Sequence, residues 1–253
     1  MSAATLQALG PDVNIWLGIG VSAPGILKQH GVDVTSRPIA MMREYVALLR
    51  ECLSGETVSF EGDFWQVKRF RLGVRLGERK PKIVMAALNP QMLKLAGEIA
   101  DGVLLNYLPA SHIASSVEII RSGGSARIFS YVHAAVGDFE QQARFARRDL
   151  FNYAMADSYA NMFCSAGFAD EIDNLRARHR QRDREGALAA ISENMIQAID
   201  FIGPEAEVTS FVRSYVDAGV EYPVLMPLPW GEDRGAVARQ TMAAAVLAVE
   251  QQN

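Results

Sequence analysis

The chain has 253 residues, of which 49% are hydrophobic and 21% charged, and its formal net charge is -4. This length is ample for a large core, and the composition excludes a disordered, collagen-like or disulfide-stapled chain. A mildly acidic protein lacks the basic footprint of nucleic-acid binding, so we expect no nucleic-acid partner. The first residues do not resemble a signal peptide, and the apolar stretch at residues 242–249 is too short to cross a membrane. We therefore expect a cytoplasmic protein with no membrane partner.

Apolar residues recur along the whole chain in two alternating patterns, one typical of helices and one of short buried strands, which predicts an α/β protein. Five candidate core strands begin at Val13, Lys82, Gly102, Arg127 and Tyr222. In chain order, the pattern predicts a helix over 3–9, a strand over 13–20, an irregular stretch to 36, a helix over 38–55, a hairpin within 58–67, a loop over 73–80, a strand over 82–87 and a helix over 90–100. It then predicts a strand over 102–105, a helix over 112–121, a strand over 127–136 and a helix from 138 to 156. Residues 157–202 are expected to be wholly helical in several pieces, followed by a helix that starts at Pro204 and ends before Gly219, a strand over 222–226 and a last helix.

A glycine-containing turn, Gly18-Ile19-Gly20-Val21-Ser22, directly follows the first predicted strand, where α/β proteins bind ligands with backbone amides. The turn is no dinucleotide fingerprint, because Ala23 stands where the third glycine belongs. It comes close to a nucleophile elbow, with Pro24 in place of the second glycine of that motif. A ligand site and a tight strand exit without a ligand both remain open.

A second motif, Ala86-Ala87-Leu88-Asn89-Pro90, follows the strand predicted over 82–87. Asn89 suits a helix N-cap and Pro90 the first helical position, which leaves the amides of Gln91 and Met92 free. Such a helix end can hold a phosphate, and small alanines let a bulky group approach the backbone. The alternative is a helix that is merely well capped.

Three further side chains are candidates for lining a substrate pocket. His30 lies in a predicted irregular loop, and Tyr107 and Trp230 each follow a strand end, where an aromatic ring could pack against a planar ligand. The histidines show no metal-ligand spacing, so we expect no metal site. His133, within an apolar strand, is expected to be a core residue.

Four segments in order resemble one known family: residues 16–22, 43–50, 55–62 and 95–106. They are similar to the bacterial luciferase-like flavin and deazaflavin oxidoreductases, above all to the branch that depends on coenzyme F420 and includes methylenetetrahydromethanopterin reductase-like proteins. The resemblance implies a TIM-type (β/α)₈ barrel with the cofactor, F420 or alternatively FMN, at the carboxyl ends of the strands.

The resemblance also assigns cofactor-binding positions, residue by residue. Gly18, Gly20 and Ser22 match the exit of the family's fourth strand, and Asn106 matches the exit of the sixth, near the phosphate or ribityl chain. The fifth-strand exit, which holds the phosphate side, is matched by Ala86, Ala87, Leu88, Asn89 and Pro90. Many relatives have Gly at the position of Asn89.

This chain departs from the family pattern at its front, where relatives carry roughly 80 to 90 further residues with the first strands of the barrel. We therefore expect one partial domain over residues 1–253, with about five of the eight strands (4 to 8) and insertions at 21–80 and 157–202. The catalytic residues of relatives lie on the absent strands, so none is assigned here. Open sheet edges predict a homodimer or a partner chain that covers the gap.

The leading functional hypothesis is an oxidoreductase that carries out hydride transfer or oxygen activation on a small organic substrate, as a fragment of such an enzyme. One alternative is a serine hydrolase that uses Ser22 with an acid and a histidine such as Asp101 and His133. Another is a non-catalytic barrel remnant that binds a partner chain.

Overall fold

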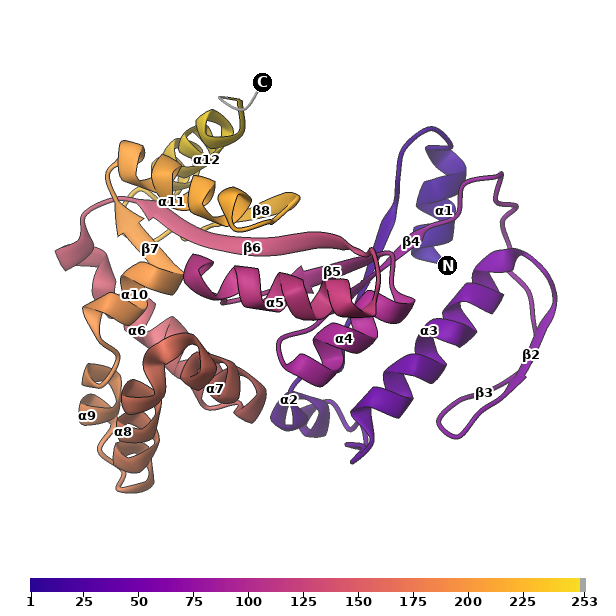
Figure 1. Cartoon of the computed structure of the whole chain (residues 1–253), viewed down its shortest axis with the longest axis horizontal. Helices are drawn as coiled ribbons and strands as arrows, with labels where there is room; N and C mark the ends of the chain where they lie inside the picture. The colour runs from indigo at the N-terminus through magenta and orange to yellow at the C-terminus, as the bar shows by residue number, and fades with distance from the viewer. Residues whose placement is uncertain (251–253) are drawn as a thin grey trace. The chain divides into compact units, whose positions relative to one another are not determined.

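The computed structural model describes residues 1–250, and the chain divides into two compact units. Unit 1 comprises residues 1–104 and 119–127, and unit 2 comprises 105–118 and everything described from residue 128 onward. No helix within the described residues combines the length and apolarity that a membrane crossing requires. Most of the elements of each unit are labelled in Figure 1.

Unit 1 contains parallel strands, helices and a separate hairpin. Its elements are α1 (Ser2–Leu9), β1 (Trp16–Ile19), α2 (Pro24–Gln29), α3 (Pro38–Ser54), β2 (Val58–Glu61), β3 (Gln66–Phe70), β4 (Lys82–Ala86), α4 (Pro90–Ile99) and most of β5 (Gly102–Leu105), together with the last residues of α5 (Ala110–Gly123).

Unit 2 contains three further strands and most of the helices. Its elements are the first part of α5, nearly all of β6 (Arg127–Val136), α6 (Phe139–Ala154), α7 (Asp157–Phe163), the π-helical turn Cys164–Phe168, α8 (Ala169–Arg180), α9 (Arg184–Ala189), α10 (Glu193–Ile199), β7 (Asp200–Gly203), α11 (Glu205–Asp217), β8 (Tyr222–Pro227) and α12 (Arg234–Glu250).

The strands of unit 1 pair in parallel, β1 with β4 and β4 with β5. Ile19 lies opposite Met85, so the carboxyl ends of β1 and β4 finish side by side. Asp101, just before β5, fixes this arrangement: its Oδ2 accepts the Ile83 amide of β4 at 2.7 Å, while its Oδ1 accepts from Arg50 of α3 at 3.3 Å. The buried middle of β4 is apolar on both sides, as expected for a parallel strand.

The hairpin of β2 and β3 is held to α3 by one carboxylate. Glu44 accepts hydrogen bonds from the backbone amides of Asp63, Phe64 and Trp65 at 2.8–2.9 Å. Although burial opposes ionisation, these three amides outweigh it and lower the pKa of Glu44. The Tyr45 ring stacks on Trp65 at 4.9 Å. The turn of the hairpin therefore folds around a side chain of the preceding helix.

In unit 2, β6 pairs in parallel with two strands. Its residues 133–136 lie opposite β7, and its residues 129–134 lie opposite β8. The core of this unit is apolar, with fully buried side chains such as Ile128, Leu150 and Phe163. Tyr215 of α11 is also buried, and its hydroxyl donates to the Leu108 carbonyl at 2.6 Å.

The α/β class and the predicted strands at Lys82, Gly102, Arg127 and Tyr222 are confirmed. The first predicted strand begins at Trp16 rather than Val13, which is exposed. The expectation that residues 157–202 are wholly helical is wrong, because β7 begins at Asp200 directly after α10. The stretch predicted as irregular before Ser36 also contains the short helix α2.

The missed strand shows the limit of periodicity. Ile199, Phe201 and Ile202 continue an apolar run out of α10, and a run this short does not distinguish a helix end from a buried strand. The structure decides in favour of a strand because the backbone of β6 pairs with these residues.

Helix α4 and the end of α5 approach each other through a glycine. A Cβ atom added to Gly97 of α4 would collide with the carbonyl oxygen of Ile120, since the two backbones touch there. Glycine normally weakens a helix interior by about 1 kcal/mol relative to alanine. Gly97 is explained here by the close approach of the Ile120 backbone, which leaves no room for a side chain.

We expect Gly97→Ala to lower the free energy of unfolding by about 1–3 kcal/mol, because the clash exceeds the gain in helix propensity. Gly25→Ala is the matched control, since a Cβ on Gly25 of α2 meets no atom within 4 Å. Urea unfolding of both variants measures the effect. Equal stability of Gly97→Ala and the wild type would contradict the close contact.

Candidate functional site

The exits of β1 and β4 lie together at one edge of unit 1. Gly20 follows β1 and Ala86 ends β4, and a Cβ added to Gly20 would lie 3.2 Å from the Ala86 Cβ. Gly18, Gly20, Ser22 and Ala86 are all exposed, and a Cβ on Gly18 would meet nothing within 4 Å. The two motifs selected from the sequence thus form one surface of small residues.

Ser22 adopts a left-handed backbone conformation, with φ of 65°. This conformation costs a non-glycine residue roughly 1–2 kcal/mol, and such strain gathers at ligand sites. The turn exposes Ser22 next to the start of α2, whose first residue is Pro24. The strain is therefore located at the strand exit where a ligand is expected.

The start of α4 lies directly after β4. Asn89 occupies the N-cap position with an extended backbone, as predicted, but its side chain makes no capping hydrogen bond. Pro90 is the first helical residue, and the first intrahelical bond runs from the Leu93 amide to the Asn89 carbonyl at 2.9 Å. The amides of Gln91 and Met92 therefore have no acceptor within the helix, and the positive end of the helix dipole lies with them.

The serine hydrolase hypothesis gains no support from these residues. Both carboxylate oxygens of Asp101 are engaged, one by the Ile83 amide and one by Arg50. The His133 ring hydrogen-bonds Asn106. The acid and the histidine that this hypothesis names are thus held by other partners.

A second group of polar side chains lies inside unit 2, beginning with Asn106 and Tyr107. The Asn106 Oδ1 accepts from His133 Nε2 at 3.0 Å, and its Nδ2 donates to the Tyr159 hydroxyl at 3.0 Å. Tyr107 is 4% exposed, and its hydroxyl donates to Asp149 Oδ2 at 2.6 Å. Like Ser22, Tyr107 has a left-handed backbone, with φ of 55°.

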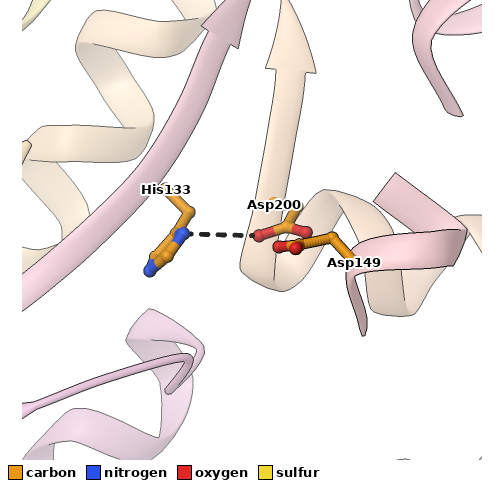
Figure 2. A group of neighbouring side chains, drawn as sticks. All are labelled: His133, Asp149 and Asp200. Atoms are coloured by element: carbon orange, nitrogen blue, oxygen red, sulfur yellow. Dashed lines mark ion pairs between the residues drawn. The ribbon is translucent and has the colours of Figure 1, made fainter. Parts of the chain in front are cut away.

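Asp200 lies at the centre of this group. In the parallel pairing of β6 and β7 it is directly opposite His133, and Asp149 of α6 points toward it (Figure 2). The His133 Nδ1 and Asp200 Oδ1 are 3.7 Å apart, which is too long for a hydrogen bond. Neither Nδ1 nor either oxygen of Asp200 has a hydrogen-bond partner among the described residues.

Burial sets the charges of this cluster. It lowers the pKa of His133 to about 4 and raises the pKa of Asp200 well above its usual range, with the nearby Asp149 adding to the shift of Asp200. Burial likewise raises the pKa of Asp149, although the Tyr107 hydroxyl opposes this shift. At neutral pH the imidazole is therefore uncharged, and the Asp200 carboxyl is driven toward its protonated form.

The remaining predicted positions lie apart from these groups in sequence. His30 is exposed and follows the last residue of α2. Trp230 is half-buried in unit 2 and stacks on Phe145 of α6, with ring centroids 6.2 Å apart. Their assignment to a substrate pocket stays a prediction.

Together, parallel strands with a glycine turn and a helix N-terminus at their exits define an α/β protein of the kind that binds ligands at strand ends. The model of the luciferase-like monooxygenase family matches residues 1–222, and the chain belongs to that family. The predicted family and its oxidoreductase class are thereby confirmed.

Individual relatives agree with this assignment. The 5,10-methylenetetrahydromethanopterin reductase of Archaeoglobus fulgidus is 26% identical over 231 residues, which cover 86% of this chain and 68% of the relative. The protein of the same name from Methanolobus tindarius is 34% identical over 223 residues, or 81% of this chain and 65% of the relative. The chain thus spans about two thirds of their length.

A solved structure shares the fold. The coenzyme F420-dependent tetrahydromethanopterin reductase from Methanopyrus kandleri matches with a TM-score of 0.70 at 19% identity, over 98% of this chain and 76% of that one. At this identity the likeness establishes the fold alone.

Sequence reasoning did not find Asp149 and Asp200. They lie 16 and 67 positions beyond His133, and no local spacing connects the three residues. One signal was present, since Asp200 is an acid within the apolar run of Ile199, Phe201 and Ile202. An acid in such a run indicates either a partner or an unusual protonation state.

We expect Tyr107→Phe to lower the free energy of unfolding by about 1–3 kcal/mol, because the partly buried Asp149 loses its hydroxyl donor. Tyr131→Phe is the control. Tyr131 lies on β6 with its ring centroid 6.4 Å from that of the His133 ring, and its hydroxyl makes no hydrogen bond among the described residues. Thermal and urea unfolding compare the two. A Tyr107→Phe protein as stable as Tyr131→Phe would show that this hydrogen bond contributes nothing net.

Proposed function

We propose that this chain is an oxidoreductase of the luciferase-like family that holds coenzyme F420, or alternatively FMN, at the exits of β1 and β4. The observation that supports this proposal most strongly is the joining of two motifs at one edge of unit 1, where Gly20 and Ala86 leave the backbone open beside the N-terminus of α4. The names of the relatives agree with a reductase that uses F420.

The residues of this surface suit different parts of the cofactor. Gly18, Gly20 and Ala86 leave room for a planar ring or a linker to approach the backbone. The amides of Gln91 and Met92 suit the phosphate of the cofactor, because the N-terminus of a helix such as the 10-residue α4 attracts anions. When bound, such a cofactor supplies hydride transfer to or from a small organic substrate.

Several finer predictions remain part of the proposal. Strands β1, β4, β5, β6 and β8 would correspond to the later strands of the family's eight-stranded barrel, and a second copy or another chain would cover the open strand edges. The assignments of His30 and Trp230 to the substrate, and of Asn106 to the cofactor, stay predictions. Within unit 2, the Asn106 side-chain amide holds His133 and Tyr159.

We expect Ala86→Leu to weaken F420 binding at least about tenfold, because a leucine side chain fills the space above the β4 exit. Fluorescence titration of the purified chain with F420, and separately with FMN, measures the dissociation constants. Ala40→Leu, at an exposed position of α3, is the control and should bind like the wild type. Failure of the wild type to bind either cofactor would overturn the proposal.

We expect Gln91→Glu to have opposite effects on stability and binding. A carboxylate in the first turn of α4 stabilises the helix by about 0.3–1 kcal/mol but repels a phosphate at the same amides. Binding of F420 should weaken severalfold, and less so at high salt because charges are screened. Gln141→Glu, in the first turn of α6 in unit 2, is the matched control. If Gln91→Glu bound F420 as tightly as the wild type, the proposal that the phosphate binds at the N-terminus of α4 would be wrong.

A further inference from the structure

Three side chains of unit 2 that the proposed function does not use have the chemistry of metal ligands. His133 comes from β6, Asp149 from α6 and Asp200 from β7, and each offers one ligand atom within 4.8 Å of the other two. Figure 2 shows the carboxylates of Asp149 and Asp200 next to each other, with one ring nitrogen of His133 facing Asp200. An imidazole nitrogen with two carboxylates is a ligand set that zinc and related divalent ions accept.

The cluster leaves its ligand atoms without partners. Asp200 is 0% exposed, and both of its carboxylate oxygens lack a hydrogen bond among the described residues. The His133 ring is 5% exposed, and its Nδ1 also lacks one. Buried polar groups are nearly always paired, and an unpaired buried carboxylate is especially costly. These atoms therefore require an occupant.

The surrounding side chains orient the ligands as they do around metal ions. Because Asn106 Oδ1 can only accept, His133 Nε2 carries the ring proton, and the lone pair of Nδ1 is directed toward Asp200. A carbonyl oxygen on the far nitrogen is a common partner of metal-binding histidines. Tyr107 likewise donates to one oxygen of Asp149 and leaves the other available.

We propose that His133 Nδ1, Asp149 and Asp200 bind one divalent transition-metal ion of the Zn²⁺ type. Metal bonds of about 2.0–2.2 Å require ligand atoms roughly 3.3 Å apart in a tetrahedron. His133 Nδ1 and Asp200 Oδ1, at 3.7 Å, are already near this separation. The fourth position is left to water.

Charge and access agree with this occupant. Two ionised carboxylates balance the double positive charge of the ion, so that the buried site becomes neutral. Asp149 is half-buried rather than fully buried, so one ligand of the cluster is not sealed from solvent. Once bound, the ion ties β6, β7 and α6 together. This inference concerns unit 2 alone and does not depend on cofactor binding in unit 1.

The competing occupant is a proton on Asp200. Asparagine resembles a protonated aspartic acid in shape and charge, so Asp200→Asn separates the two cases. If a proton is the occupant, the variant keeps everything that the wild type has. If a metal ion is the occupant, the variant loses a ligand.

The experiment is a calorimetric titration with Zn²⁺ alone, after chelator treatment, with Cys52 and Cys164 replaced by Ser in every protein so that no thiolate contributes. We expect one ion per chain for the wild type and at least about 100-fold weaker binding for Asp200→Asn. Asp138→Asn, at the N-cap of α6, is the matched control and should bind like the wild type. No binding by the wild type, or equal binding by Asp200→Asn, would overturn the metal site.

A second variant and a spectrum keep the test decisive if Asp200→Asn does not fold. Asp149→Asn changes a less buried ligand and keeps an acceptor for Tyr107, and we expect the same loss of affinity. X-ray absorption at the zinc edge of the loaded wild type should show nitrogen and oxygen ligands with one imidazole. A zinc spectrum without imidazole would place the ion elsewhere and reject the proposal.

Discussion

Parallel pairing of strands is the constraint on which both groups of candidate functional residues depend. Strands that run in the same direction end at the same edge, so residues far apart in sequence meet there. In unit 1 this brings Gly20 beside Ala86 and the start of α4. In unit 2 the register of parallel pairing, and not the strand ends, sets His133 within β6 opposite Asp200, the first residue of β7, although 67 positions separate them. Parallel pairing therefore brings together two groups of residues with different chemistry, one exposed and one buried.

The two groups of residues differ in how they accommodate charge. The strand exits of unit 1 offer backbone amides, small side chains and a helix dipole, none of which carries a full charge, and Gly18, Gly20 and Ala86 are exposed there. Such a site attracts an anion without an ionised side chain to desolvate. The cluster of unit 2 gathers ionisable groups where water is excluded. The free energy of this cluster depends on what neutralises its ionisable groups. Binding at the strand exits of unit 1 depends instead on whether a ligand fits the open backbone.

Sequence patterns predicted the elements whose signals are local. Asp138 before α6 and Gly55 after α3 mark helix ends through their own backbone and side chains, and both occupy the predicted cap positions. The motifs at the exits of β1 and β4 are also local, so their residues were identified. The cluster around Asp200 depends on β7, whose four residues become a strand only by pairing with β6. The acid within an apolar run marks Asp200 as unusual, but no local pattern identifies β6 as the partner of β7.

The free-energy cost of burying the Asp200 carboxyl group argues that the ion proposed to bind there contributes substantially to the stability of unit 2. Keeping a carboxyl group protonated at pH 7 costs about 4 kcal/mol relative to its ordinary ionisation in water. That is a large part of the net stability of a typical domain, about 5–15 kcal/mol. Hydrogen bonds to the acid would offset this cost, but the described residues provide none to either oxygen. The neighbouring Asp149 adds to the cost of ionisation instead of relieving it. A cation between the two carboxylates reverses both effects, because it stabilises the charged form of each and converts their repulsion into shared attraction to one ion.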